Sequence, residues 1–273
     1  MKRIGVVVRP SHPQHDEVVR PLVDWLHQRQ QEVFVIDITK KKRFPVVEMV
    51  IVLGGDGTLL SVARRLAGQK VLVLAVNLGR LGFLTEVTFK ELYPTLERIL
   101  KGQFLEDRRQ TLQCVVLRDS ARIPCPITLN EVAIHSGALA KLIELSVSID
   151  HHFVTTLRAN GVLISTPTGS TAYALSAGGP IVYPSVEALV LAPIAPHMLT
   201  QRPLVIPAHA KIEVTLKTVA KGPVAMFDGN EAILLKVGDA VRIQVSEAPL
   251  VLVRSPHRNY YQVLREKLKW GEE

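Results

Sequence analysis

Residues 50–60 read VIVLGGDGTLL, and this stretch decides the class of fold. The apolar run at 49–53 is typical of a strand buried on both faces, and residues 58–67 have the pattern of a helix that ends at Gly68. Three glycines between them allow a tight turn at the carboxyl end of the strand, where open α/β sheets bind their ligands. Free N–H groups at a helix start attract phosphate, so the acid in the same turn, Asp56, needs an explanation.

The same alternation of strand and helix runs through the first third of the chain. Runs rich in Val, Ile and Leu at 4–8, 33–38, 49–53 and 71–76 are separated by helical patterns, which favours a parallel sheet buried on both faces. After about residue 100 the sequence changes to short strands joined by turns, as at 112–117, 142–149 and 212–216. The predicted fold class is α/β, with an N-terminal Rossmann-like parallel α/β domain and a C-terminal β-rich, β-sandwich-like domain.

The domain boundaries follow from where the pattern changes. A helix predicted at 89–101 ends at Gly102, so we assign residues 1–100 to the α/β domain and 101–254 to the β-rich domain. The tail, 255–273, returns to helical spacing of apolar residues. We therefore expect the tail to join the α/β domain.

The composition is that of an ordinary folded protein. Of 273 residues, 47% are hydrophobic and 21% charged, and the net charge of +8 should attract polyanions such as nucleotides, polyphosphate, nucleic acid or acidic membrane. The basic run at 40–43 is short enough for a solvated loop, and prolines interrupt the apolar residues at 182–196. We expect neither a nucleic-acid nor a membrane partner.

Cysteine usage indicates the compartment. Cys114 and Cys125 are too far apart in sequence for a metal or redox pair and too few for a disulfide framework. The apolar start at 4–8 breaks at Pro10, short of a signal-peptide core. We expect a cytoplasmic protein, and without a His/Cys cluster no permanent metal site is predicted.

Asp56 has two interpretations. It is a helix N-cap, a position that favours Asp, or it faces a hydroxyl group and accepts its proton while neighbouring amides hold a phosphoryl donor. Neither G-x-G-x-x-G nor G-x-x-x-x-G-K-[ST] is present in the turn, so it is neither a dinucleotide fingerprint nor a Walker loop. The motif by itself indicates phosphoryl transfer to an alcohol.

Several motifs together resemble one family. GGDGT at 54–58 resembles the signature of NAD kinases, diacylglycerol and sphingosine kinases and, more loosely, phosphofructokinases. NLGRLGFLT at 77–85, LNEV at 129–132 and GVLISTPTGSTAYALSAGGP at 161–180 follow in the order found in bacterial NAD kinases, and the tail at 264–271 agrees. On these motifs the chain resembles the ATP- or polyphosphate-dependent NAD kinases.

The resemblance implies an activity and a set of site residues. It implies phosphoryl transfer from ATP or polyphosphate to the adenosine ribose 2′-hydroxyl of NAD, with a divalent ion, Mg²⁺, on the donor and a homodimer or homotetramer. Asp56 matches the proton acceptor, with the site between the two domains. The matching substrate-binding positions are Gly57, Asn130, Glu131, Lys141, Arg158, Asn160, Thr171, Ala172, Tyr173, Ser176 and Asn230. Arg158 is expected to act across a subunit interface.

One position departs from the family. Asn160 stands where many relatives have Asp near the nicotinamide end, and an amide lacks the charge that would favour a cationic nicotinamide ring. The preference for NAD over NADH is therefore left open. Rival interpretations are a lipid kinase, a nucleotide-binding regulator or nucleic-acid binder without catalysis, and a Rossmann dehydrogenase. For Tyr173 the alternative is a side chain buried in the core.

Overall fold

The chain forms two compact units. The computed structural model describes residues 1–8, 15–40, 44–66, 68–79, 81–137, 141–218 and 222–271; most of the basic run, Ala67 of the predicted helix and Arg80 of the 77–85 loop lie outside them. One unit comprises Met1–Arg108 with Leu250–Glu273, and the other comprises Arg109–Pro249. The first unit extends past residue 100, and its C-terminal part begins before residue 255. The reason is that the strands at 106–109 and 250–253 join its sheet.

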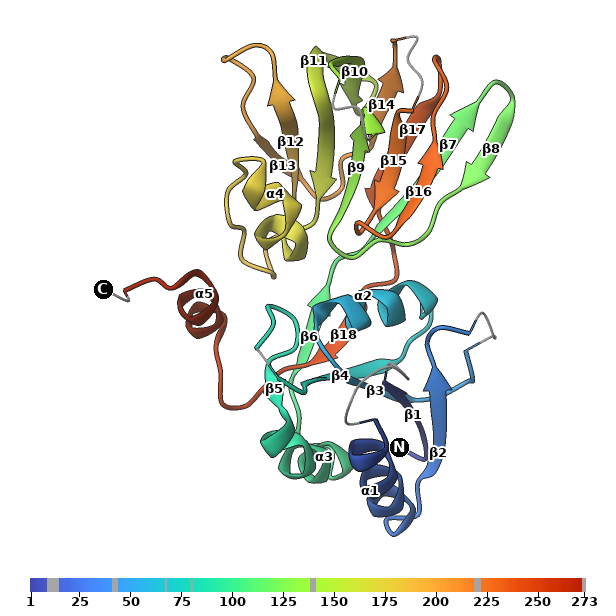
Figure 1. Cartoon of the computed structure of the whole chain (residues 1–273), viewed down its shortest axis with the longest axis vertical. Helices are drawn as coiled ribbons and strands as arrows, with labels where there is room; N and C mark the ends of the chain where they lie inside the picture. The colour runs from blue at the N-terminus through green and yellow to red at the C-terminus, as the bar shows by residue number, and fades with distance from the viewer. Residues whose placement is uncertain are drawn as a thin grey trace. The chain divides into compact units, whose positions relative to one another are not determined.

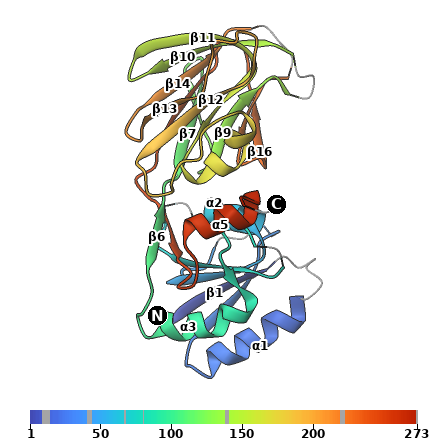
Figure 2. The same cartoon turned by 90° about the vertical axis from the view of Figure 1, so that its left-hand side faces the viewer.

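The first unit is built on a largely parallel sheet with helices on both faces (Figures 1 and 2). Its strand order is β2-β1-β3-β4-β18-β6, with β5 also paired to β4. The strands are β1 (Arg3–Val8), β2 (Glu32–Asp37), β3 (Met49–Leu53), β4 (Leu72–Asn77), β5 (Val87–Thr88), β6 (Glu106–Arg109) and β18 (Leu250–Val253). The helices are α1 (His15–His27), α2 (Asp56–Arg65), α3 (Leu92–Leu100) and α5 (Tyr260–Leu268).

The topology places the glycine turn at a switch point. From β1 the chain adds β2 on one side, and β3 then pairs with the other side of β1, all in parallel. Strand order reverses between β1 and β3, and ligands of open α/β sheets bind at the carboxyl ends of the strands there. The turn that connects β3 to α2 lies at this edge.

Helices cover both faces of the sheet because alternate strand residues point to opposite sides. One core cluster contains alternate residues of β1, β3 and β4 together with apolar residues of α1 and α3. Helix α2 lies on the other face of the sheet (Figure 2). The predicted helix at 89–101 is divided, since a 3₁₀ turn at Phe89–Glu91 with a Thr88–Glu91 capping box precedes α3.

The second unit is an antiparallel sheet wrapped around one core. Its order is β16-β15-β9-β11-β10-β14-β17-β7-β8, with β12 paired to both β11 and β13. The strands are β7 (Leu112–Arg118), β8 (Ala121–Pro124), β9 (Glu131–His135), β10 (Ile143–Ile149), β11 (His152–Ser165), β12 (Ala188–Pro196), β13 (Leu204–Pro207), β14 (Ile212–Leu216), β15 (Val224–Phe227), β16 (Glu231–Leu234) and β17 (Ala240–Val245). The predicted fold class, a parallel α/β domain followed by a β-rich domain, is confirmed.

Alternation in β9, β11 and β12 also positions the short helix α4 (Tyr173–Ser176). Val162 and Ile164 enter the main core, whereas Leu163 between them packs with Ala174 of α4 and Val190 of β12 on the opposite face. Both faces of β11 are thus buried at this end. The hydroxyl-rich segment before α4 is thereby held against the sheet.

The two cysteines, which are well separated in sequence, lie close together in the structure. In the β7–β8 hairpin Val115 pairs with Pro124, so Cys114 and Cys125 come next on facing strands, and the Cys125 N–H donates to the Cys114 carbonyl at 3.3 Å. Both are free thiols packed against the core. Burial raises the pKa of Cys125 to about 11 and the pKa of Cys114 well above its ordinary value.

We expect both thiols to be inert in the folded protein, because the thiolate is the reactive form and a raised pKa depletes it. At pH 8 labelling by a thiol reagent should be roughly a hundredfold slower than for free cysteine, and it should become fast in urea. Rapid labelling of either thiol without denaturant would contradict the buried hairpin pair.

Candidate active site

The glycine turn forces the chain from strand into helix within two residues. Gly54 has φ +152, which L side chains rarely adopt, and a Cβ there would lie 2.8 Å from Thr58 Oγ1. Gly55 is the N-cap of α2 and makes no side-chain hydrogen bond. Gly55 and Gly57 are exposed, so the start of α2 is open to solvent, and the N-terminal N–H groups of a helix favour an anion.

Asp56 is bound to a loop that is distant in sequence. It is the first residue of α2, so the interpretation of Asp56 as the N-cap is wrong. Its carboxylate accepts hydrogen bonds from the Phe83 N–H at 2.9 Å, the Leu84 N–H at 3.2 Å and the Thr85 hydroxyl at 3.1 Å. The turn at 54–58 and the loop at 77–85, which the sequence separates, therefore form one structure in the first unit.

A second carboxylate organises the Asn-Glu segment of the other unit. Asp228 is buried and accepts from the backbone N–H groups of Leu129 (3.0 Å), Asn130 (2.7 Å) and Glu131 (3.3 Å). It occupies the first central position of the β15–β16 turn, with φ 47. The pair Asp228-Gly229, typical of a hairpin turn, is the one sequence signal that points to this position.

The hydroxyl-rich segment that begins at Thr166 hydrogen-bonds the residues just before Glu131. The Thr166 hydroxyl donates to the Leu129 carbonyl at 2.6 Å, and the Thr166 N–H donates to the Asn130 carbonyl at 2.9 Å. The Tyr173 N–H hydrogen-bonds the Glu131 carboxyl group. The Tyr173 side chain is 42% exposed, so its interpretation as a core residue is wrong. Three motifs from distant parts of the sequence meet in the second unit.

Two acceptor atoms at this meeting point are unsatisfied within the described chain. Asn130 Oδ1 and Glu131 Oε2 are buried and accept no hydrogen bond from any described residue. Burial raises the pKa of Glu131 to about 8, and the negative charge of Asp228 adds to this, while the Tyr173 N–H opposes it. Glu131 is therefore mostly a neutral acid at pH 7, able both to donate and to accept a hydrogen bond.

The remaining predicted residues fall into two groups. One group belongs to the segments that meet Asn130 and Glu131. The segment around α4 carries Thr171, Ala172 and Ser176, and the Asp228 turn carries Asn230. Lys141 and Arg158 are exposed and do not join that cluster in a single chain.

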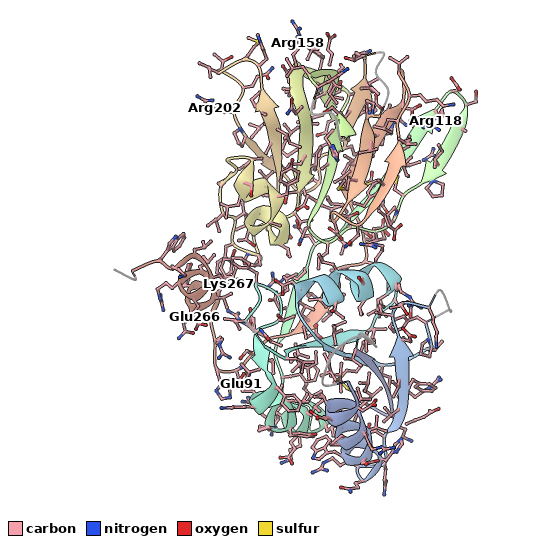
Figure 3. The ribbon with its side chains drawn as sticks, in the orientation of Figure 1. Glu91, Arg118, Arg158, Arg202, Glu266 and Lys267 are labelled. Atoms are coloured by element: carbon pink, nitrogen blue, oxygen red, sulfur yellow. The ribbon has the colours of Figure 1, made fainter. Side chains whose placement is uncertain are left out.

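Arg158 and Asn160 lie on β11, which runs on to Ser165 beside the cluster. At about 3.3 Å per residue, Arg158 is roughly 20 Å along this strand from Ser165. Figure 3 shows Arg158 at the end of the second unit away from α4. Asn160 lies between them and accepts the Ser136 N–H at 2.9 Å through its carbonyl.

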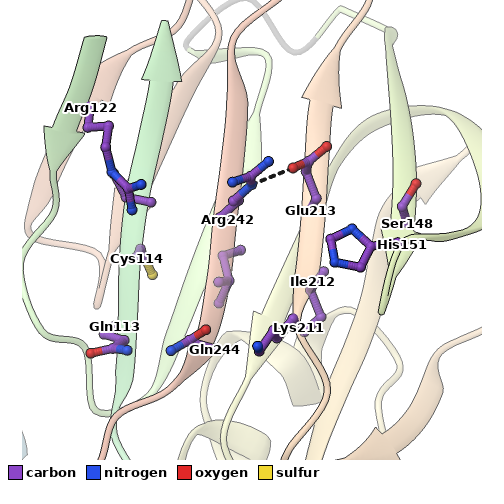
Figure 4. Close-up of a pocket in the computed structure, with 12 residues that line it drawn as sticks. Gln113, Cys114, Arg122, Ser148, His151, Lys211, Ile212, Glu213, Arg242 and Gln244 are labelled. Carbon is purple, nitrogen blue, oxygen red and sulfur yellow. Dashed lines mark hydrogen bonds and ion pairs between the residues drawn. The ribbon is translucent and has the colours of Figure 1, made fainter. Parts of the chain in front are cut away.

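One pocket of the second unit lies away from these residues. A pocket of about 620 Å³ covers the outward face of β7, β17, β14 and β10 and includes Arg122, Lys211 and Arg242 (Figure 4). Arg242 is already paired with Glu213 at 2.6 Å, and no predicted site residue lines the pocket. Its exposed, solvated cations do not make it the functional site.

Two further observations concern metal ligands and membrane spans. Among the described residues, no three His, Cys, Asp or Glu side chains are grouped so that they could hold a metal ion. Over the same part of the chain, no helix combines the length and apolarity needed to cross a membrane.

Comparison with known proteins identifies the family. Residues 34–104 match the profile of the ATP-NAD kinase N-terminal domain, and residues 129–255 match that of the ATP-NAD kinase C-terminal domain. The NAD kinase of Syntrophotalea carbinolica is 44% identical over 287 residues, with 100% of each chain covered.

Two solved structures have the same fold as this chain. Yeast NADH kinase, complexed with NADH, has a TM-score of 0.91 at 26% identity, covering 100% of this chain and 89% of that one. An NAD kinase from Archaeoglobus fulgidus in complex with ATP has a TM-score of 0.79 at 26% identity, with 98% of each chain covered. The fold and the matched relatives define a phosphotransferase. The chain belongs to the NAD kinase family.

We expect Glu131 to make stability depend on pH. Its folded pKa of about 8 exceeds the ordinary value of 4.5, so between these pH values the folded protein keeps a proton that the unfolded chain releases. Stability from this group is therefore fully present at low pH and is lost as pH rises, by at most about 1.4 kcal/mol per pH unit. Glu131→Gln should match the parent near pH 5 and become relatively more stable toward pH 8 in urea unfolding.

Glu144→Gln, at an exposed position of β10, controls for removal of one carboxylate. A stability difference between Glu131→Gln and the parent that stayed constant from pH 5 to pH 8 would show that Glu131 is not held neutral.

Proposed function

We propose that the protein transfers a phosphoryl group from ATP or polyphosphate to the 2′-hydroxyl of the adenosine ribose of NAD, forming NADP in the cytoplasm. The observation that carries this is the pair of buried acceptors, Asn130 Oδ1 and Glu131 Oε2, which accept no hydrogen bond from the described chain. Such atoms need donors, and ribose hydroxyls supply them. The exposed ring of Tyr173, whose N–H binds Glu131, offers a stacking face for adenine at the same place.

The first unit supplies what phosphoryl transfer requires. N–H groups at the start of a helix favour an anion, and the dipole of α2 adds to their effect. In the loose transition state of such transfers, positioning and charge stabilisation provide most of the rate. Asp56 then orients the attacking hydroxyl and accepts its proton, since a carboxylate in hydrogen-bond reach of an alcohol acts as a general base.

The donor requires a divalent cation, for which Mg²⁺ is our proposal. The one carboxylate of the glycine turn, Asp56, is assigned to the substrate hydroxyl, and Mg²⁺ characteristically keeps several waters and binds phosphate oxygens. We therefore propose an ion that arrives with the donor and is held mainly by its phosphates. When bound, it would neutralise negative charge on the phosphates.

The remaining residues complete the substrate site. We assign Thr171, Ala172, Tyr173 and Ser176 to the adenine pocket, and Gly57, Asn130, Glu131 and Asn230 to the adenosine half of NAD. Lys141, Arg158 and Asn160 are assigned to the nicotinamide half. Because Arg158 lies roughly 20 Å along β11 from the cluster, it would reach NAD bound to a second copy, which supports a homodimer or homotetramer. The ATP of the Archaeoglobus neighbour and the NADH of the yeast neighbour support a nucleotide donor and a dinucleotide acceptor.

Asp56→Asn should keep NAD binding and lower kcat at least about a hundredfold, because the amide cannot accept the proton. NADP formation from Mg-ATP and NAD, followed by an NADP-specific cycling assay, measures the rate, and calorimetry measures binding. Asp24→Asn on the exposed face of α1 is the matched control. Turnover of Asp56→Asn equal to the parent's would remove Asp56 as the base.

Asn160→Asp should shift acceptor preference toward oxidised NAD by about tenfold in kcat/KM relative to NADH, because the added charge attracts the cationic ring. The comparison uses purified NAD and NADH at equal Mg-ATP. Gln113→Glu adds the same charge on β7 and should leave the ratio unchanged. An unaltered NAD to NADH ratio in Asn160→Asp would place residue 160 away from the nicotinamide.

A further inference from the structure

The direction of the Asp56 carboxylate is set by the loop at 81–85. Asp56 begins α2, where a side chain has no helical turn before it to restrict its rotation. Three donors nevertheless hold it: Phe83 N–H on Oδ2, and Leu84 N–H together with the Thr85 hydroxyl on Oδ1. Fixing a carboxylate through both oxygens leaves it little freedom to turn.

Thr85 contributes the one side-chain donor of the three. It is fully buried, so water cannot replace its hydroxyl. The loop backbone is also pressed against the carboxylate, since a Cβ on Gly82 would lie 2.1 Å from Asp56 Oδ1 and 2.4 Å from Thr85 Oγ1. Only glycine at position 82 allows this approach.

The hydrogen bonds distinguish the two carboxylate oxygens. Each oxygen of an ionised carboxylate has about two acceptor sites. Oδ1 accepts two hydrogen bonds from the described loop and Oδ2 accepts one. Oδ2 therefore keeps the capacity to accept a further hydrogen bond.

We propose that Thr85 is a positioning residue for phosphoryl transfer: its hydroxyl and the loop amides hold Asp56 so that Oδ2 meets the substrate hydroxyl. The proposal rests on the proposed function of Asp56 as proton acceptor. Thr85 does not touch substrate and acts through the carboxylate that it binds.

The C-terminal helix holds the same loop from another side. Lys267 of α5, labelled in Figure 3, donates from Nζ to the Leu81 carbonyl at 3.1 Å, and its ammonium lies 5.5 Å from the centre of the Phe83 ring. The tail of the chain thus contacts the first part of the loop at 81–85. We infer that Lys267 is a second, weaker contributor to the same positioning.

Thr85→Val removes the hydroxyl at nearly constant shape. It should lower kcat about ten- to hundredfold, the effect of one lost hydrogen bond to a charged group, with KM for NAD changed less than about twofold. Thr85→Ser keeps the hydroxyl and should restore kcat to within about threefold of the parent. Thr95→Val, at a buried threonine of α3 in the same unit, is the control for loss of a hydroxyl and should keep full kcat.

Parent-like kcat in Thr85→Val, or equal impairment in Thr85→Ser, would overturn the proposal. If Thr85→Val does not fold, Lys267→Met carries the test, because it alters an exposed contact of the same loop. A severalfold lower kcat at unchanged KM supports the proposal, and an unchanged kcat overturns it.

Asp56→Asn is assayed in parallel. An active Asp56→Asn defeats the proposed function itself, whereas an inactive Asp56→Asn beside a fully active Thr85→Val defeats only the positioning role.

Discussion

A carboxylate removed from water must be given hydrogen-bond donors, and this constraint organises both halves of the molecule. In the first unit, Asp56 obtains its donors from residues 83–85. In the second unit, Asp228 obtains its donors from residues 129–131. Each aspartate lies in a turn that contains glycine and draws a distant loop against that turn. The same short-range chemistry thus organises one loop in each unit.

The presence of an acid in a phosphate-binding turn follows from this arrangement. Asp56 precedes Gly57 at the start of α2, where N–H groups and the helix dipole favour an anion. Its carboxylate is bound by two N–H groups and a hydroxyl of the neighbouring loop. The donors that satisfy the acid therefore come from a different segment than the start of α2.

The pattern of residues was enough to predict the fold class and the segments that carry the site. Buried apolar runs identified the parallel strands, and glycine turns identified where they end, because both signals are local in sequence. The roles of Asp228 and Thr85 were not predicted. Each depends on a hydrogen bond across 27 or more residues, which no local periodicity encodes. The proximity of Cys114 and Cys125 was not predicted for the same reason: an ordinary hairpin brings them opposite each other.

Glu131 differs from the two aspartates in a way that suits a neutral ligand group. Asp56 and Asp228 each accept three hydrogen bonds, whereas Glu131 is buried with one oxygen unsatisfied and a pKa raised to about 8. A neutral, partly bonded carboxyl group can both donate to and accept from a ligand hydroxyl without adding charge to its site. The two aspartates hold backbone segments in place, and Asp56 Oδ2 also keeps one free acceptor site. In the second unit, the free bonding capacity lies in Glu131 Oε2 and Asn130 Oδ1.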